Sequence, residues 1–423
     1  MIPFFCLRFF PEKRKTPLKI ELFNQKILGG ILILLRFFST LFIVLLVLSF
    51  IPSAVFAASA SVSHKRFISL ASGLHHGNFD GTFYDGVALR LHPAHLKQGT
   101  DTSGKYHSGT YYYGTWTSPV INENFLESIA SWEANTPLNT WIEVELRVQS
   151  GNRWSSWYSM GVWHENDLPF RRHSVSGQSD EFGRVSVDTL VLNQTASAVQ
   201  ARVTLFTTEP GRSPVLTSLG LSVASGKDEP GQVPGTGLTS ALDVPMRSQM
   251  VYPDGGEVWC SPTSVSMVMA YWAKVMNQPG WDQPVPQVVT KVWDYVYDGG
   301  GNWAFNTAYA ASAGLEAKVV RLKSLADAEQ WIAHRVPVIA SIAYGKGELP
   351  GSPIPSSNGH LLVIRGFDEK GDVLTNDPAG PSDGEVRITY PREAFEKAFL
   401  NHSNGTVYLI YPKGWDIPQG DRW

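Results

Sequence analysis

Apolar and polar residues alternate over much of the first half of the chain. Within residues 141–148, one face of an extended backbone carries Ile142, Val144, Leu146 and Val148, and the other carries Glu143, Glu145 and Arg147. This period of two with one polar face predicts a half-buried antiparallel strand. Similar runs occur at Val185–Leu192, Val199–Thr207 and Leu216–Val223. Several short strands separated by Asn, Ser, Gly and Pro predict an all-β, jelly-roll-like sandwich over residues 66–225.

The alternation stops at residues 226–240, whose sequence is GKDEPGQVPGTGLTS. This segment can bury very little apolar surface, so it predicts an exposed, flexible linker between two domains. After the linker, a helical period appears behind Cys260, with an apolar stripe at Val265, Val268, Met269 and Trp272. Pro262 fits only the first turn of a helix, because proline lacks the donor that later turns need. The predicted helix therefore begins at or just after Cys260.

The rest of the second half combines helical and extended patterns. Helices are expected at about Ser324–Arg335 and Arg392–Leu400. The expected strands are Val336–Ala343, His360–Phe367, Val373–Asn376, Glu385–Tyr390 and Thr406–Tyr411. A helix followed by a largely antiparallel sheet predicts an α+β domain over residues 241–412, with a tail at residues 413–423.

The N-terminal region has the order of a secretory signal. Basic residues come first, the apolar run Phe37–Ile51 follows, and small residues surround Ala57. The run has roughly 15 residues, whereas a membrane-spanning helix needs roughly 20. Residues 1–57 are therefore expected to be a signal peptide of a secreted or cell-surface protein, with an uncleaved N-terminal anchor as the alternative.

Composition narrows the range of functions. The chain of 423 residues carries a formal net charge of −3, which argues against nucleic-acid binding. Glycine (38), proline (27) and tryptophan (14) are plentiful and charged residues are few (17%), a balance that favours turn-rich β structure. Of the two cysteines, Cys6 lies in the predicted leader. Cys260 is then the one thiol expected in the exported protein, and it has no partner for an internal disulfide.

A thiol becomes a nucleophile when its anion is stabilised, which both a helix N-terminus and an imidazolium can do. Cys260 has the first feature. His360 opens an apolar strand after a small polar loop, and Asp377 ends the next strand. A tight turn at residues 368–371 would place both at the same end of a hairpin, where a carboxylate can orient the imidazole. Asn376 is the alternative, because neighbouring strand residues face opposite sides and only one can contact His360.

A candidate oxyanion donor, Gln249, lies eleven residues before Cys260. Its side-chain amide could fold back beside the thiol and act together with the backbone amide of Cys260. The thiol, imidazole, carboxylate and amide would then supply the groups that acyl transfer requires.

The order of Gln249, the segment 259–264 (WCSPTS), Gly359-His360 and residues 376–378 (NDP) resembles family thirty-nine of the cysteine peptidases. These are the bacteriocin-leader peptidase type, and the likeness is closest to exported, stand-alone members. It covers about residues 241–412. The resemblance implies a papain-like fold in which Cys260 is the nucleophile and His360 the general base. It also implies that Asp377 orients the base and Gln249 donates to the oxyanion.

The first half also resembles an N-terminal β-sandwich that accompanies such domains in secreted bacterial proteins. The segments that carry this likeness are 114–120, 131–132, 140–143 and 154–158. The aromatic side chains are expected to fill or cover the sandwich, with stacking on sugar rings as the alternative; they are Tyr111, Tyr112, Tyr113, Trp116, Trp154 and Trp157. The histidines of this half lack a companion cluster of ligands, so no metal site is expected; they are His75, His76, His92 and His95.

Taken together, the sequence predicts a secreted cysteine peptidase that hydrolyses peptide or protein substrates, among them cell-wall peptides. It requires no cofactor or metal, has no nucleic-acid partner, and meets a membrane only through an uncleaved leader. One alternative is a cell-wall peptide amidase or acyl transferase with the same site. Another is a wall-binding or adhesion protein that uses the peptidase fold as a scaffold.

Overall fold

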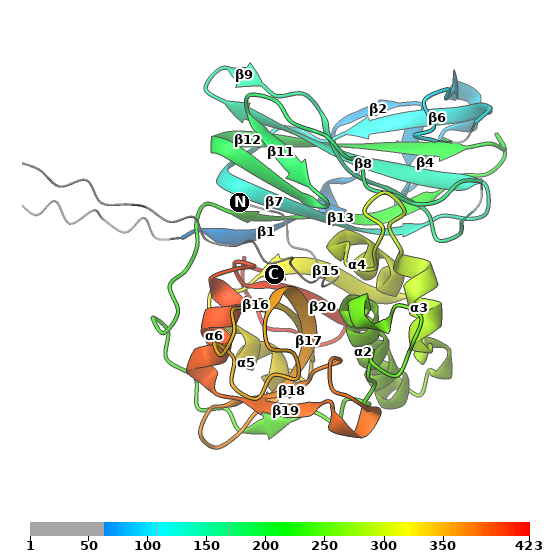
Figure 1. Cartoon of the computed structure of the whole chain (residues 1–423). Helices are drawn as coiled ribbons and strands as arrows, with labels where there is room; N and C mark the ends of the chain where they lie inside the picture. Colours follow the sequence, from blue (N-terminus) through cyan, green and yellow to red (C-terminus); the bar gives the residue numbers. More distant parts are fainter. Residues whose placement is uncertain (1–62, 107, 168) are drawn as a thin grey trace, which may run out of the picture. The chain divides into compact units, whose positions relative to one another are not determined.

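The computed structural model describes residues 63–423 except residues 107 and 168. These residues belong to one compact unit, coloured from blue to red along the chain in Figure 1. Within the described ranges, no helix is both long and apolar enough to cross a membrane. The predicted signal peptide, residues 1–57, lies outside the described residues.

The first half of the described chain is all β, as the alternation of apolar and polar residues predicts. Its strand pairs are antiparallel, which suits hairpins joined by short turns. The strands are β1 (Lys65–Ser69), β2 (Asn78–Asp80), β3 (Thr82–Tyr84), β4 (Leu89–Leu91), β5 (Lys97–Thr100), β6 (Thr110–Thr117), β7 (Ile121–Asn135), β8 (Thr140–Ser150), β9 (Arg153–Trp154), β10 (Tyr158–Trp163), β11 (Gly183–Ser186), β12 (Thr189–Thr207) and β13 (Val215–Ala224). The 3-10 turns η2 (Ala71–Gly73) and η3 (Pro93–His95) lie between them.

The long strand β12 takes part in two groups of strands. Its first half pairs with β7 and β11, whereas its second half pairs with β8 and β6. The register with β7 shifts between Val191 and Ala196, and such irregularities change the direction of a strand. β12 therefore connects the two groups through one continuous backbone.

The single strand predicted at Val185–Leu192 is wrong. β11 ends at Ser186 and β12 begins at Thr189, and the two pair as a hairpin. Val187 in the turn has a φ of 59°, in the left-handed region that a β-branched residue rarely adopts. The apolar pattern runs through this turn without a glycine or proline, so the sequence carries no signal for it.

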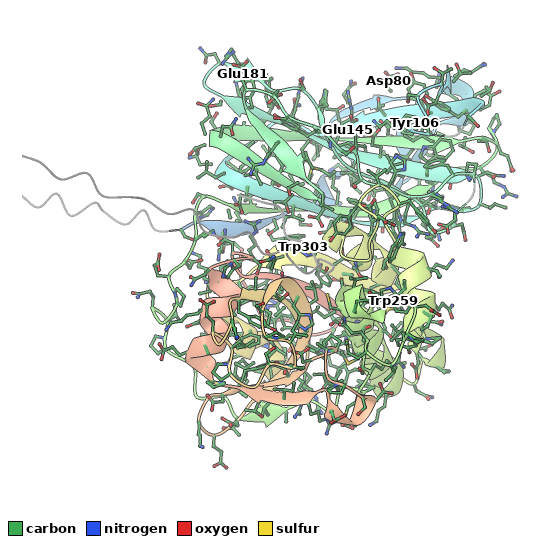
Figure 2. All side chains as sticks on the ribbon, in the orientation of Figure 1. Asp80, Tyr106, Glu145, Glu181, Trp259 and Trp303 are labelled. Carbon is green, nitrogen blue, oxygen red and sulfur yellow. The ribbon has the colours of Figure 1, made fainter. Side chains whose placement is uncertain are left out.

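Two glutamates on the polar face of β8 are buried, so the prediction of a half-buried strand is wrong at these positions. Glu143 and Glu145 are only 2% and 8% exposed. Lys105 and Tyr106 contact Glu143 from the loop before β6, and Arg202 of β12 forms an ion pair with Glu145. Tyr106 and Glu145 are labelled in Figure 2. Buried carboxylates are tolerated when they are paired in this way. The alternation therefore reports which side chains are polar, but not whether a loop covers them.

The second half is α+β, as predicted. Its helices are α2 (Cys260–Met276), α3 (Val285–Val292), α4 (Trp303–Ser312), α5 (Leu325–Ala333) and α6 (Arg392–Leu400). Its strands are β14 (Ser240–Ala241), β15 (Leu315–Arg321), β16 (Val338–Tyr344), β17 (Ser357–Phe367), β18 (Val373–Asn376), β19 (Arg387–Tyr390) and β20 (Thr406–Pro412). Three 3-10 turns complete it, namely η4 (Gly256–Val258), η5 (Pro279–Trp281) and η6 (Asp383–Glu385).

One antiparallel sheet organises this half. The strand order is β15-β20-β16-β17-β18-β19, and β14 adds a short pairing to β17. Helix α2 packs against β17 and β20, and α5 packs against β16 and β17 (Figure 1). The sheet and the first turn of α2 thereby bring together segments about a hundred residues apart in the chain.

The predicted linker contains no helix, and β14 begins only at its last residue, Ser240. Most of its residues are exposed. Two of its backbone amides nevertheless bind buried carboxylates: Gly231 donates to Glu396 of α6, and Thr236 donates to Glu329 of α5. The segment is therefore fastened along the second half of the chain.

Buried contacts also join the all-β half to the α+β half. The Arg172 side chain, which is 1% exposed, donates to the carbonyl oxygen of Thr290 at 2.9 Å. The rings of Phe305 in α4 and Trp132 in β7 meet edge to face, with centroids 6.3 Å apart. A wholly buried aromatic pair and a buried guanidinium bonded to a carbonyl group indicate one continuous packed interior rather than two loosely tethered domains.

Candidate active site

The nucleophile candidate lies at the start of helix α2. Cys260 is its first residue, which agrees with the predicted helix start, and the side chain is 3% exposed. The turn η4 leads into it, and Gly255 before η4 has a φ of 107°, which glycine adopts without strain. Trp259, labelled in Figure 2, occupies the N-cap position, and the centroids of its ring and that of Tyr252 lie 5.6 Å apart. The backbone amides of the first turn of α2 therefore lie beside the thiol.

The hairpin β17–β18 carries the histidine and the carboxylate. In its register, Val363 pairs with Asn376, so His360 and Asp377 lie at the same end of the two strands. His360 Nε2 lies 2.7 Å from Asp377 Oδ1, and both side chains are fully buried. A carboxylate only accepts hydrogen bonds, so Nε2 carries the proton and donates it. This arrangement fixes both the tautomer and the orientation of the ring.

The other side of the imidazole meets the thiol. Burial lowers the pKa of His360, but the charge and hydrogen bond of Asp377, followed by the hydrogen bond and charge of Cys260, raise it to about 10. Because Asp377 occupies Nε2, the ring nitrogen left for Cys260 is Nδ1. Cys260, His360 and Asp377 therefore form one contiguous set of contacts across α2, β17 and β18.

Asp377 is held by donors on both of its oxygens. Oδ1 accepts from His360 and from the backbone amide of Ala379 at 2.9 Å, and Oδ2 accepts from the Tyr390 hydroxyl at 2.7 Å. Burial raises the pKa of Asp377, but the charge of His360 and these hydrogen bonds outweigh it and lower the pKa below its ordinary value. The sequence carries no signal for the role of Tyr390, because a tyrosine at a strand end does not reveal which group it contacts.

Asn376, the alternative partner of His360, points elsewhere. Its Nδ2 donates to the carbonyl oxygens of Val244 and Pro245, at 3.1 and 3.0 Å. Of the two adjacent residues, Asp377 is the one that contacts the imidazole. Asn376 instead fastens the segment after β14 to β18.

Gln249 lies close to the carboxylate side of this set. Its backbone amide donates to the carbonyl oxygen of Pro378 at 2.8 Å, and Pro378 directly follows Asp377. The side chain is 2% exposed. Its Oε1 has no hydrogen-bond partner among the residues that the structure describes. Gln249 therefore belongs to the same buried region as Asp377.

Two hydroxyl groups tie the first turns of α2 to the sheet. Ser264, one turn after Cys260, donates to the carbonyl oxygen of Leu361, the residue after His360, at 3.2 Å. The hydroxyl groups of Ser261 and Tyr408 in β20 lie 2.9 Å apart. Neither contact has a sequence signature, yet the first fixes the helix of the thiol to the strand of the imidazole.

Comparison with known proteins matches both halves of the chain to family models. Residues 64–224 match the family described as Peptidase C39 N-terminal domain, and residues 241–407 match the Peptidase C39-like family. The two matches support a C39-like family member. The resemblance to family thirty-nine of the cysteine peptidases is thereby confirmed, and family membership suggests a cysteine-peptidase type of function.

Among solved structures, one similar chain is described as a candidate C39-like peptidase from Bacillus anthracis. It is 18% identical, and the match covers 42% of this chain and 100% of that chain with a TM-score of 0.28. A search of curated proteins found no match.

Histidines of the all-β half lie close to one another in two places. Among residues 63–106, 108–167 and 169–423, no three His, Cys, Asp or Glu side chains are placed to hold a metal ion. The ring centroids of His92 and His95 lie 4.4 Å apart, and those of His75 and His76 lie 3.8 Å apart. Each of these is a pair of rings rather than a ligand set.

The shifted histidine predicts a pH dependence of stability. The pKa of His360 is about 10 in the folded protein, against 6.5 for an ordinary histidine. Between these values the folded protein keeps a proton that the unfolded chain has lost. The contribution of His360 to the free energy of unfolding is therefore fully present below about pH 6.5 and is lost as the pH rises towards 10. We expect the thermal unfolding midpoint to decrease over this window, and to decrease less steeply in His360→Gln. Parallel curves for the two proteins would contradict the expectation.

Proposed function

We propose that this protein is a secreted cysteine peptidase that hydrolyses peptide bonds. Cys260 is the nucleophile, His360 the general base and acid, Asp377 the group that orients His360, and Gln249 the oxyanion donor. The observation that carries the proposal is the buried contact of His360 with Asp377 on one side and Cys260 on the other. A helix N-terminus and an imidazolium both stabilise a thiolate, and Cys260 has both neighbours.

The reaction proceeds by acyl transfer in two steps. The Cys260 thiolate attacks the carbonyl carbon of the peptide bond, and a C–S bond forms while the oxygen becomes an oxyanion. The His360 imidazolium gives its proton to the amine, the C–N bond breaks, and a thioester remains. A water molecule then attacks the thioester while His360 accepts its proton. The C–S bond breaks, the acid product leaves, and the thiolate–imidazolium pair is restored.

Gln249 and the backbone amide of Cys260 stabilise the oxyanion. A donor for this role has to be held in place before the charge develops. Burial of Gln249 and the bond from its backbone to Pro378 support such preorganisation. The amide of Cys260 lies at the start of α2, where backbone N–H groups have no partner within the helix.

The proposal extends to the fold and the location of the protein. A nucleophile at the start of a helix and a base on an antiparallel sheet support a papain-like arrangement of the α+β half. The two strand groups joined by β12 support a jelly-roll-like sandwich in the first half, since strands that switch sheets occur at the corners of such sandwiches. The order of basic, apolar and small residues in 1–57 supports export.

Alkylation of the native protein tests the state of the thiol. We expect iodoacetamide to modify Cys260 well below pH 8.5, the region in which an ordinary thiol ionises. In His360→Gln the modification should require a more alkaline pH. A wild-type thiol that reacts only at alkaline pH, or only after unfolding, would favour the scaffold or adhesion alternative. Analysis of the products with an added amine then separates a hydrolase from an acyl transferase.

A further inference from the structure

The Asp377 carboxylate has a neighbour that the proposed reaction does not use. Tyr390, the last residue of β19, is wholly buried and donates to Oδ2, the oxygen turned away from His360. A hydroxyl group bound to Oδ2 holds the plane of the carboxylate, because Oδ1 is already fixed by His360 and by the amide of Ala379. With three donors on two oxygens, the carboxylate has little freedom to rotate.

The Tyr390 hydroxyl is itself held by a second hydroxyl group. Burial raises the pKa of Tyr390 and the nearby Asp377 raises it further, whereas a hydrogen bond from Ser352 lowers it. The Tyr390 hydroxyl group has a single proton, and it donates this proton to the Asp377 carboxylate, which can only accept. Tyr390 therefore accepts from Ser352 and gives its own proton to Asp377.

The same proton count extends the chain by one step. The Tyr344 hydroxyl at the end of β16 lies 2.5 Å from Ser352 Oγ, and its other acceptor, the carbonyl oxygen of Ile354, is more distant at 3.4 Å. Each hydroxyl group has one proton to donate, and Ser352 directs its proton to Tyr390. Ser352 therefore accepts from Tyr344, and the donation runs from Tyr344 through Ser352 and Tyr390 to Asp377. Hydrogen bonds aligned in one direction strengthen one another in a buried site.

This chain passes through the loop between β16 and β17, residues 345–356. Leu349 is the one buried residue of the loop, and the strand that follows it, β17, carries His360. Ser352 lies in the loop, so the carboxylate beneath the imidazole is connected to a surface segment that enters the same strand. A tyrosine with a purely structural role could donate to any buried acceptor, whereas Tyr390 donates to the carboxylate that orients the imidazole.

We propose that Tyr390 is a positioning residue for the peptidase site, and that Ser352 and Tyr344 hold its hydroxyl group in the donating orientation. The inference rests on the proposed function of Cys260, His360 and Asp377. It adds a further side chain, Tyr390, which acts through Asp377 and does not touch the substrate. The Tyr390 hydroxyl group keeps Oδ1 of Asp377 directed at His360 Nε2, and this stabilises the imidazolium that pairs with the thiolate.

The test compares three single-hydroxyl variants of the full chain. Tyr390→Phe removes the donor to Asp377, and Ser352→Ala removes only the support behind it. Tyr271→Phe is the matched control, because its hydroxyl donates to the carbonyl oxygen of Arg335 and lies about three turns along α2 from Cys260. Iodoacetamide labelling of Cys260 from pH 4 to pH 10 is followed by peptide mass spectrometry, which requires no substrate.

We expect the labelling midpoint of Tyr390→Phe to rise by about one pH unit, a tenfold change in the thiolate equilibrium. Ser352→Ala should shift in the same direction by less, and Tyr271→Phe should match the wild type. On a cleaved peptide, kcat of Tyr390→Phe should fall about tenfold with little change in KM. If Tyr390→Phe is too unstable to measure, the Ser352→Ala shift decides.

Two results would overturn this inference and leave the proposed function unaffected. One is a wild-type protein with an acidic labelling midpoint that Tyr390→Phe and Ser352→Ala leave unchanged. The other is a midpoint that moves to lower pH, which would mean that the hydroxyl group weakens the carboxylate rather than orienting it. A wild-type thiol with an ordinary alkaline midpoint would instead remove the proposed function, and this inference with it.

Discussion

Cys260→Ala is expected to abolish peptide hydrolysis, with kcat/KM reduced by at least about 10⁴-fold. The proposed covalent intermediate forms on this sulfur, and loss of a nucleophile from a catalytic set of this kind costs about 10⁶-fold in kcat in the best-studied serine enzyme. The variant should fold normally, because exchanging a small buried thiol for a methyl group changes the packing little. Substrate binding should also persist, so the variant is suited to trapping substrates.

The measurement is a comparison of new protein N-termini generated by the wild type and by Cys260→Ala in the same extracellular protein mixture. Cleavages due to this enzyme should disappear in the variant. Ser261→Ala is the matched control, since it changes the next residue of α2 and removes only the contact with Tyr408; it should keep most of the activity. Equal sets of new N-termini from the wild type and Cys260→Ala would reject the peptidase proposal.

Local pattern was sufficient to predict the elements that carry the candidate site. Pro262 and the apolar stripe after it predicted that α2 begins at or just after Cys260, and the observed helix begins at Cys260. The turn signal at residues 368–371 predicted the β17–β18 hairpin, whose register brings His360 and Asp377 to one end. These features depend on a few neighbouring residues, so they can be found without knowledge of the fold.

Features that depend on tertiary cover could not be predicted in the same way. Helix α4 is buried over nearly all its length, from Ala304 to Ala311, so it has no polar face to reveal a helical period. Glu143 on β8 is polar but covered by Lys105 and Tyr106 from another segment. In both cases burial is decided by residues distant in the chain, and the local pattern of polarity is then misleading or silent.

The contacts that orient the site residues also depend on tertiary structure. Tyr390 contacts Asp377 across the paired strands β18 and β19, although the register places Val373 and not Asp377 opposite Tyr390. Ser264 reaches a backbone carbonyl group on β17, and any residue type could have supplied that acceptor. Side chains that perform the chemistry are restricted to a few types and so are visible in a sequence, whereas the groups that orient them are not.

Asp377→Asn is expected to lower kcat/KM by about 10³- to 10⁴-fold, comparable to the loss from the same exchange in a serine peptidase triad. The amide has one acceptor oxygen in place of two, while His360 Nε2, Ala379 and Tyr390 all donate to this side chain. At least one buried donor therefore loses its acceptor. An amide NH₂ group facing Nε2 would also favour the wrong tautomer of the imidazole. Loss of the negative charge should move Cys260 labelling to higher pH as well.

The neighbouring residue provides the control for this prediction. Asn376→Ala removes two hydrogen bonds to the carbonyl oxygens of Val244 and Pro245, so it should cost about 1–3 kcal/mol of stability. Its kcat/KM and its labelling profile should stay close to those of the wild type, because Asn376 faces away from the imidazole. Steady-state kinetics and thermal unfolding of both variants separate the two roles. A loss of activity in Asn376→Ala that equals the loss in Asp377→Asn, at a temperature where both are folded, would mean that Asp377 contributes only to the fold.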